Sequence, residues 1–162
     1  MRTRVDVVVG DLLEQDVEVI VNAWNRNFIP WWLLLPQGVS GAIKRAGGYA
    51  PFRELSKHGL LAAGAAIATG AGRLPFRAIV HVAGLSAFWT SSETIVRACV
   101  RNALDLATAN GYRSMAFPLI GAGTGGLTPS RVQEVMLDEI SRSSYAGRVV
   151  VVVFPNASRD LE

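Results

Sequence analysis

A glycine-rich turn is the part of this sequence best suited to chemistry on a charged ligand. Phe117 to Ile120 reads as the end of a buried strand, and the turn from Gly121 to Gly126 follows it directly. These residues carry almost no side chain, so their backbone N–H groups can point into one concavity and donate to a phosphate. Thr128 and Pro129 then predict a helix start, where anions bind. On this motif alone, the alternative that the glycines only make a tight connection stays open.

The glycine spacing also matches the fingerprint of dinucleotide-binding folds, but the context excludes that interpretation. In such folds a second strand carries an acidic residue about 20 residues further on, and more of the sheet follows. Here one helix and the strand from Arg148 to Phe154 follow. A Walker loop is excluded too, because no Gly-Lys-Ser/Thr follows the glycines. We therefore expect no cofactor.

Polar residues follow two further predicted strands at the point where each strand ends. Asp11 comes after the strand predicted for Arg4 to Val9. Asn22 and Asn25 end the apolar run from Val17 to Ala23, which predicts a central strand covered on both faces. Ligands of open α/β sheets bind at such strand ends. The alternative is that the amides of Asn22 and Asn25 both cap backbone groups of the following loop.

A second helix start follows this strand. Residues 26–37 form a loop rich in aromatic residues and leucine, which either fills a gap in the core or lines a pocket. The sequence from Gly38 to Ile43 then opens a helix, with Ser40 as the predicted N-cap. This start is also suited to bind an anion.

The elements that must position these residues alternate along the chain. Further strands are predicted at 62–69, 78–83, 114–120 and 148–154, and helices at 38–57 with one break, from Ser91 or Ser92 to about Ala109, and from Thr128 to about Arg142. Strands that alternate with helices predict an α/β three-layer sandwich in one domain over residues 1–160. The first two strands have no helix between them, so we expect a mixed sheet.

Composition excludes several classes of protein. No apolar run approaches the roughly 18 to 20 residues that span a bilayer, so we expect a cytoplasmic protein without a membrane partner. The net charge is +3 and the basic residues are scattered, which argues against a nucleic-acid groove. The single Cys99 excludes an internal disulfide and a cysteine metal cluster, and its apolar neighbours predict a buried core thiol. No metal is expected, and we assign no role to His58 or His81.

Four motifs taken together resemble the macrodomain family: Gly10-Asp11, Asn22-Ala23-Trp24-Asn25, Gly38-Val39-Ser40-Gly41-Ala42-Ile43 and Pro118-Leu119-Ile120-Gly121-Ala122-Gly123. Their order and spacing cover the chain from about Val5 to Phe154. The resemblance implies a six-stranded mixed sheet between helical layers. It also implies a pocket for ADP-ribose, free or attached to a protein.

The resemblance also implies roles for individual residues. Asp11 would accept from the adenine amino group beside the Leu12 backbone, and Asn25 would bind the distal ribose. The two glycine-containing loops would grip the diphosphate from either side. The predicted catalytic residues are Asn25 and Ser40. The predicted ligand-binding residues are Asp11, Leu12, Asn22, Asn25, Gly38, Val39, Ser40, Gly121, Ala122, Gly123, Thr124, Gly125 and Gly126.

The sequence departs from the family pattern in the first of these loops. Hydrolytic members commonly carry a run of glycines followed by Val-Asp, whereas here residues 28–37 replace most of the glycines and Ser40 occupies the Asp position. Gly125 stands where an aromatic residue often covers the distal ribose. Trp31 or Trp32 would supply that surface, or both pack in the core. Because serine is a poor base, water activation would fall to the ligand's own phosphate or to a loop residue.

Two functions follow from these residues. The first is an ADP-ribosyl hydrolase that releases ADP-ribose from a modified protein side chain or a related small molecule. The alternative is an ADP-ribose-binding reader without turnover, which the substitutions at Ser40 and Gly125 favour. The single predicted domain favours the hydrolase. Single-stranded nucleic-acid binding fits the basic pI, but the sequence lacks a basic stripe.

Overall fold

The computed structural model describes residues 2–24, 38–86, 88, 90–122 and 125–155 of the 162-residue chain. Its centre is a six-stranded sheet with the order β1-β6-β5-β2-β4-β3. The strands are β1 Arg4–Val9, β2 Val19–Trp24, β3 Ala66–Thr69, β4 Ala78–Ala83, β5 Ser114–Phe117 and β6 Arg148–Val153. All neighbouring strands pair in parallel except β3, which runs antiparallel to β4. The predicted mixed sheet and the central place of the second strand are confirmed.

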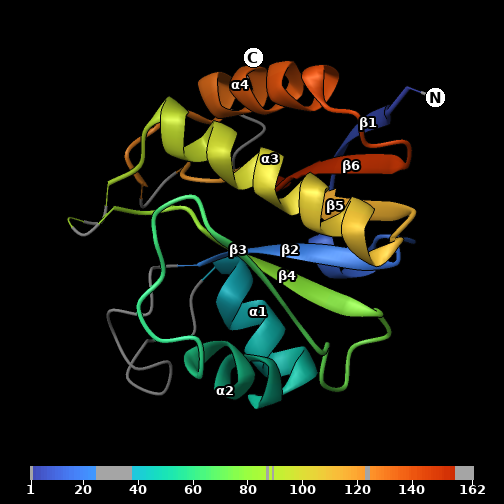
Figure 1. Cartoon of the computed structure of the whole chain (residues 1–162), viewed down its shortest axis with the longest axis vertical. Coiled ribbons are helices and arrows are strands. Elements are labelled where there is room, and N and C mark those ends of the chain that lie inside the picture. The colour runs from blue at the N-terminus through green and yellow to red at the C-terminus, as the bar shows by residue number, and fades with distance from the viewer. Residues whose placement is uncertain (1, 25–37, 87, 89, 123–124, 156–162) are drawn as a thin grey trace.

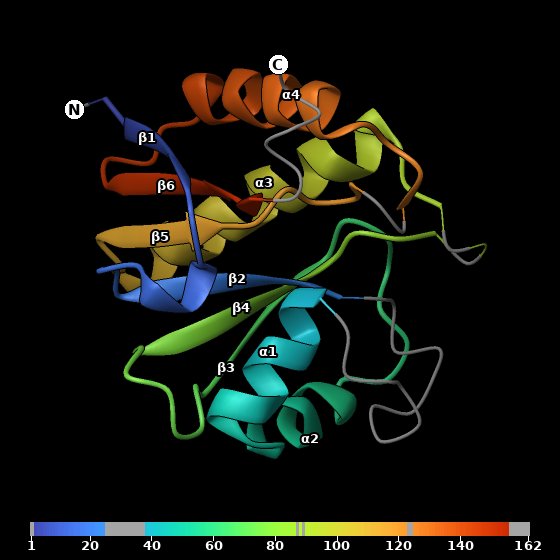
Figure 2. The ribbon, with the colours of Figure 1, turned by 180° about the vertical axis from the view of Figure 1, so that it is seen from behind.

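Helices cover both faces of this sheet (Figures 1 and 2). One layer consists of α1 Gly38–Gly47 and α2 Ala50–Ser56, and the other of α3 Glu93–Asn110 and α4 Pro129–Arg142. A single 3-10 turn, η1 Leu12–Glu14, follows β1. The three-layer α/β/α sandwich expected from the sequence is confirmed. None of the helices in the described ranges is long and apolar enough to cross a bilayer.

Two apolar clusters hold the layers together, one on each face of the sheet. Side chains alternate between the faces of a strand, so Val19 and Val21 of β2 pack towards α3 and α4, with Met136 among their buried neighbours. Ile20 and Trp24 pack towards α1 and α2. The continuous apolar character of β2 therefore reflects burial on both faces, as its sequence indicated.

The long helices begin and end at recognisable capping residues. Ser92, not Ser91, is the N-cap of α3, and its hydroxyl accepts from the N–H of Ile95. Gly111, at φ 70°, is the C-cap of the same helix. Thr128 caps α4 ahead of Pro129, as predicted. These caps fix the helix bounds to within a residue or two of the prediction.

Two strands are shorter than predicted. β5 ends at Phe117 because Pro118 has no N–H to continue the ladder. β3 begins only at Ala66, because Gly64 lies at φ 88°, outside the extended region. Both shortened strands still bring their following loops to the expected edges of the sheet.

Candidate functional site

The predicted ligand loops meet at one edge of the sheet. β1, β6, β5, β2 and β4 are parallel, so their carboxyl ends lie on the same side. The turn at 121–126 follows β5, which is the direct neighbour of β2. The described parts of the segments that follow β4 and β5 lie at the left of Figure 1. We refer to this side as the carboxyl edge.

Ser91 packs directly beneath the glycine turn. Its backbone N–H donates to the carbonyl of Gly125 over 2.9 Å. A Cβ at Gly121 would lie 2.7 Å from Ser91 Oγ and 2.8 Å from Ser91 Cβ, and a Cβ at Gly125 would lie 2.9 Å from Ser91 Cβ. The Ser91 hydroxyl is buried, and among the described residues it has no hydrogen-bond partner. Close approach of the α3 start therefore explains the glycines at both positions, and no pattern in the sequence predicts this long-range contact.

Two glycines of the turn adopt the left-handed backbone conformation. Gly121 lies at φ 80° and Gly126 at φ 84°. Leu127 N–H donates to the Gly121 carbonyl over 3.4 Å and closes the turn. Gly121, Ala122, Gly125 and Gly126 therefore lie in one tight turn ahead of α4, as the sequence indicated.

Asn22 and Ser40 are in contact at the carboxyl edge. Ser40 Oγ donates to Asn22 Oδ1 over 2.8 Å, and Asn22 is fully buried. Ser40 is the third residue of α1, not its N-cap, so the predicted capping role is wrong. Its hydroxyl turns back to the strand because Asn22 offers an acceptor directly beneath the first helical turn. The loop that Asn22 was alternatively expected to cap lies outside the described residues, so that alternative stays open.

His81 continues this contact into the core. It is fully buried and stands opposite Asn22 in the β2–β4 register. Its Nδ1 lies 3.0 Å from Asn22 Nδ2, and its Nε2 lies 2.8 Å from Thr69 Oγ1. Phe52 of α2 packs edge-on against the ring at a centroid distance of 5.7 Å. Sequence reasoning assigned His81 no role, and its place in an otherwise apolar strand was the only available signal.

Burial lowers the pKa of His81 from 6.5 to about 3. Between pH 6.5 and 3, His81 is protonated in the unfolded chain but not in the native state. The free energy of unfolding therefore falls as the pH falls through this range. From one pH unit above 6.5 to one unit below it, the free energy of unfolding should drop by about 1.4 kcal/mol. Urea titrations at the two pH values would measure this drop. His81→Gln, which cannot titrate, should lose it, and equal pH dependence in both proteins would contradict the assignment.

Asp11 lies at the same edge, after β1. It is exposed, and its Oδ1 accepts from the N–H of Leu13 over 2.8 Å as the N-cap of η1. Gln15 Nε2 donates to the Asp11 carbonyl over 2.8 Å. These bonds hold the carboxylate in one orientation. The side chain of Leu12 is buried, so only its backbone is available beside Asp11.

The start of α1 contributes Gly38 and Val39 to this edge. Gly38 is exposed at φ 60°, and a Cβ there would meet nothing within 4 Å. Further along the helix, Lys44 is buried against the rings of Trp24 and Phe52, with Nζ 5.1 and 4.9 Å from their centroids. Desolvation lowers the pKa of Lys44. The lysine thus packs α1 onto the end of β2 through cation–π contacts.

Several predicted residues fall outside the described part of the chain. They are Asn25, Trp31, Trp32, Gly123 and Thr124. Their roles stay predictions.

Cys99 is a core residue, as its neighbours indicated. It is fully buried, and burial raises the pKa of its thiol to about 12, which removes it as a nucleophile. Within the described ranges, no three His, Cys, Asp or Glu side chains come together as metal ligands.

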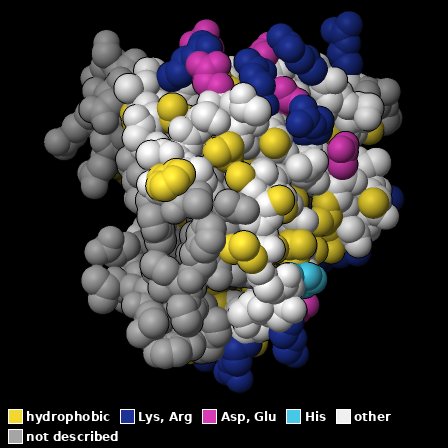
Figure 3. Space-filling model, turned by 60° about the vertical axis from the view of Figure 1, so that its left-hand side comes forward, with side chains coloured by type: hydrophobic (Ala, Val, Ile, Leu, Met, Phe, Trp, Pro, Cys, Tyr) yellow, Lys and Arg dark blue, Asp and Glu magenta, His cyan; other side chains and the backbone are white. Residues whose placement is uncertain are grey.

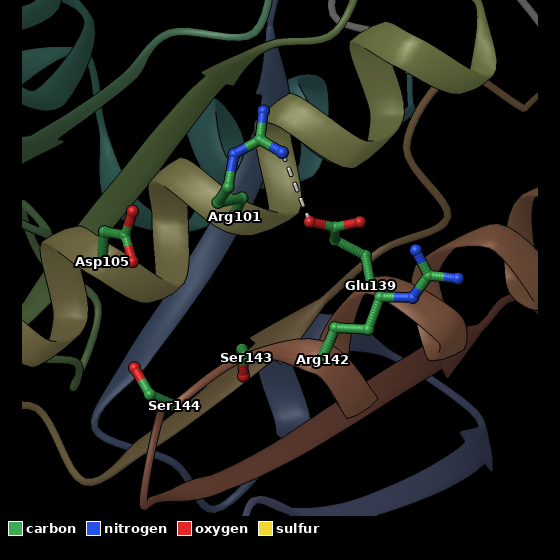
Figure 4. Close-up of a pocket in the computed structure, with 6 residues that line it drawn as sticks. All are labelled: Arg101, Asp105, Glu139, Arg142, Ser143 and Ser144. Carbon is green, nitrogen blue, oxygen red and sulfur yellow. Dashed lines mark hydrogen bonds and ion pairs between the residues drawn. The ribbon is translucent and has the colours of Figure 1, made fainter.

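A surface depression on the layer formed by α3 and α4 is lined by charged and hydroxyl side chains. It lies between α3 and the end of α4, where Arg101 Nη1 is 3.5 Å from Glu139 Oε1 (Figure 4). Arg142 pairs with Asp138 over 3.0 Å. Basic and acidic side chains alternate over the two helices at the top of Figure 3 and form no basic stripe on that face. Exposed pairs of this kind stabilise little, and we assign the depression no ligand.

The fold and the carboxyl edge together define a class of protein: a three-layer α/β domain in which two helix N-termini suited to bind an anion follow the central strands, next to the partly buried hydrogen bond between Ser40 and Asn22. Residues 21–136 match the family model described as Macro domain. The chain therefore belongs to the macrodomain family, and the resemblance found in the sequence is confirmed.

Named relatives and solved structures agree with this assignment. An O-acetyl-ADP-ribose deacetylase of Enterobacter sp. (strain 638) is 36% identical, and the match covers 99% of this chain and 92% of that protein. A variant of the Oceanobacillus iheyensis macrodomain with ADPR is 30% identical, with a TM-score of 0.77 over 96% of this chain and 87% of that one. The Trypanosoma brucei macrodomain in complex with ADP-ribose is 25% identical, with a TM-score of 0.79 over 97% of this chain and 67% of that one.

Proposed function

We propose that this protein binds ADP-ribose at the carboxyl edge and hydrolyses derivatives of it. The observation that carries the proposal is that the neighbouring parallel strands β2 and β5 each lead at their carboxyl ends to a helix start, at Gly38 and after Gly126. Backbone N–H groups at such starts stabilise a diphosphate. The similarity to a relative named O-acetyl-ADP-ribose deacetylase supports an O-acylated ADP-ribose as the first candidate substrate. ADP-ribose linked to a protein side chain is the second.

In the proposed mechanism the protein positions its ligand and supplies few groups of its own. The two loops would hold the diphosphate and Asn25 would orient the distal ribose, so that water stands near the bond to be broken. Backbone N–H groups would stabilise charge on the phosphates. Ser40 directs its hydroxyl proton to Asn22, so it is no general base. Water activation is therefore assigned to the ligand's own phosphate.

Calorimetric titration tests the binding half of this proposal. ADP-ribose should bind more tightly than ADP, AMP or ribose 5-phosphate, because only ADP-ribose reaches the adenine end, both phosphate loops and the ribose end together. Equal affinity for ADP-ribose and ribose 5-phosphate would remove adenine recognition from the account. Absence of any heat or thermal stabilisation with ADP-ribose would refute the proposal.

Asp11→Asn should weaken ADP-ribose binding about tenfold. The substitution keeps an oxygen that can accept from Leu13 N–H but removes the charge from the hydrogen bond proposed to the adenine amino group, a loss of about 1.5 kcal/mol at an exposed site. Ribose 5-phosphate, which has no adenine, is the control ligand, and its affinity should not change. An equal loss for both ligands in calorimetry would place Asp11 elsewhere in the site.

A reader without turnover is the second candidate function. The observation that favours it is the side chain at position 40. Ser40, whose hydroxyl is bonded to Asn22, occupies the position where the pattern common in hydrolytic macrodomains has an aspartate. A reader would bind ADP-ribose as tightly and release no product from any derivative. Binding assays alone do not separate the two functions, so turnover has to be measured.

A further inference from the structure

The polar contact under α1 is one end of a continuous hydrogen-bonded chain. From Ser40 it passes through Asn22 and His81 to Thr69, with steps of 2.8, 3.0 and 2.8 Å. Thr69 Oγ1 then donates to the carbonyl of Gly70 over 3.0 Å. Asn22 and His81 are fully buried, and Thr69 is 3% exposed. This series of hydrogen bonds therefore connects β3, the outermost strand of the sheet, with the first turn of α1 at the carboxyl edge.

The two hydrogen bonds to the His81 ring fit either tautomer of the imidazole, and the bond from Thr69 to Gly70 favours one direction for the whole series. Thr69 has a single hydroxyl proton, which it gives to Gly70, so it must accept from His81 Nε2. A neutral imidazole protonated on Nε2 accepts on Nδ1, so Asn22 Nδ2 is the donor there. The amide oxygen of Asn22 then faces Ser40 and receives its proton. The carbonyl of Gly70 thus determines how the hydroxyl of Ser40 points.

If every donor and acceptor exchanged roles, Asn22 and His81 would still make all their hydrogen bonds. Only the outer bonds, made by Thr69 and Ser40, would differ. With the amide turned over, Nδ1–H would donate to Asn22 and Nε2 would accept from Thr69. The bond from Thr69 to Gly70 would then be lost, and the hydroxyl proton of Ser40 would no longer go to Asn22. The Ala23 carbonyl, 3.5 Å from Ser40 Oγ, is a second acceptor within its reach. Glu54 of α2 holds Gly70 in place, because its Oε2 accepts from the Gly70 N–H over 3.0 Å. The anchored carbonyl therefore selects one of two directions.

Ser40 faces the site differently in the two directions. In the direction that the Gly70 carbonyl favours, Ser40 donates its hydroxyl proton to Asn22 Oδ1. Toward a ligand the Ser40 oxygen can then act only as a hydrogen-bond acceptor. Such a group accepts from a water molecule or a ribose hydroxyl, and it gives nothing to a phosphate oxygen. In the reversed direction Asn22 would donate to Ser40, and the Ser40 proton would be available to a phosphate oxygen or to the Ala23 carbonyl.

We propose that Thr69 and His81 are positioning residues that fix Ser40 as a hydrogen-bond acceptor, so that the group bound beside it is a water molecule or a ribose hydroxyl and not a phosphate. The substrate part of this inference rests on the proposed function. The direction of the chain does not, and it can be measured without any ligand.

The position of the proton on His81 tests the direction. Nitrogen-15 NMR of the labelled protein should show a neutral ring protonated on Nε2 in the wild type and in Thr69→Ser, which keeps the hydroxyl. Thr69→Val has the same shape but no acceptor, and it should move the proton to Nδ1, because a buried N–H without a partner is costly. A wild-type ring protonated on Nδ1, or a valine variant still protonated on Nε2, would overturn the inference.

Turnover of an ADP-ribose derivative tests the consequence for Ser40. Thr69→Val should lower kcat about tenfold, the effect of one hydrogen bond, with little change in the dissociation constant for ADP-ribose. Thr69→Ser should restore the wild-type kcat. In a Ser40→Ala background Thr69→Val should change kcat no further, whereas a purely structural effect would persist there and contradict the inference. If the wild type itself shows no turnover, the hydrolase proposal fails and the NMR result still decides the direction of the chain.

Discussion

Replacement of Gly121 by alanine is expected to lower the free energy of unfolding by about 2 to 5 kcal/mol and to abolish tight ADP-ribose binding. Two effects add at this position. Gly121 lies at φ 80°, where a side chain strains the backbone by about 1–2 kcal/mol. The new Cβ would also stand 2.8 Å from Ser91 Cβ, so either the turn or the start of α3 must shift. Chemical denaturation and calorimetry of the same preparations would measure both losses.

Gly126 provides the matched control for this substitution. Its φ of 84° is nearly the same, but a Cβ there meets no atom of the described residues within 4 Å. Gly126→Ala should therefore show only the backbone strain. Adding Ser91→Gly to Gly121→Ala should recover the part of the loss that comes from the collision. Equal losses for Gly121→Ala and Gly126→Ala would show that the contact with Ser91 does not constrain the turn.

Asn25→Ala is expected to lower kcat about a hundredfold while the dissociation constant for ADP-ribose changes much less. The reason is that Asn25, the next residue in sequence after Trp24 of β2, is proposed to orient the distal ribose. Misplacement of a reacting group lowers the rate more than the affinity. Single-turnover kinetics with an O-acylated ADP-ribose would separate the rate of hydrolysis from binding.

The alternative role for Asn25 is to cap backbone groups of its own loop. In that case Asn25→Ala should lower the free energy of unfolding by about 1 kcal/mol and leave the rate per folded molecule unchanged. Asp11→Asn is the control for a ligand contact remote from the reaction, because it should change affinity and leave kcat near the wild-type value. A wild-type kcat in Asn25→Ala would remove the proposed role.

Local patterns in the sequence predicted most of the fold. Pro129 after Thr128 and Gly111 after α3 act through bonds within their own turn, so the residue types alone indicate the helix ends. The apolar run of β2 likewise records burial on both faces. β5 was predicted too long because an apolar stretch continues past Pro118, where the ladder cannot.

Contacts between segments that are distant in sequence could not be predicted from local patterns. Ser40 was predicted as a cap because serine at a helix start usually bonds within the first turn, but a buried acceptor 18 residues earlier competes for its hydroxyl. His81 and Thr69 looked like ordinary members of their strands, since nothing local shows that their side chains share one face with Asn22. The need for glycine at 121 and 125 arises from Ser91, which is remote in sequence.

The most direct test of the central claim is the release of product from O-acetyl-ADP-ribose by the purified protein. The account predicts that acetate and ADP-ribose appear in equal amounts and that Asn25→Ala slows their release about a hundredfold. Proteins carrying ADP-ribose on known acceptor side chains, assayed in parallel, would show whether the second candidate substrate is also cleaved. If ADP-ribose binds but neither kind of substrate yields any product, the protein is a reader and the hydrolase account is contradicted.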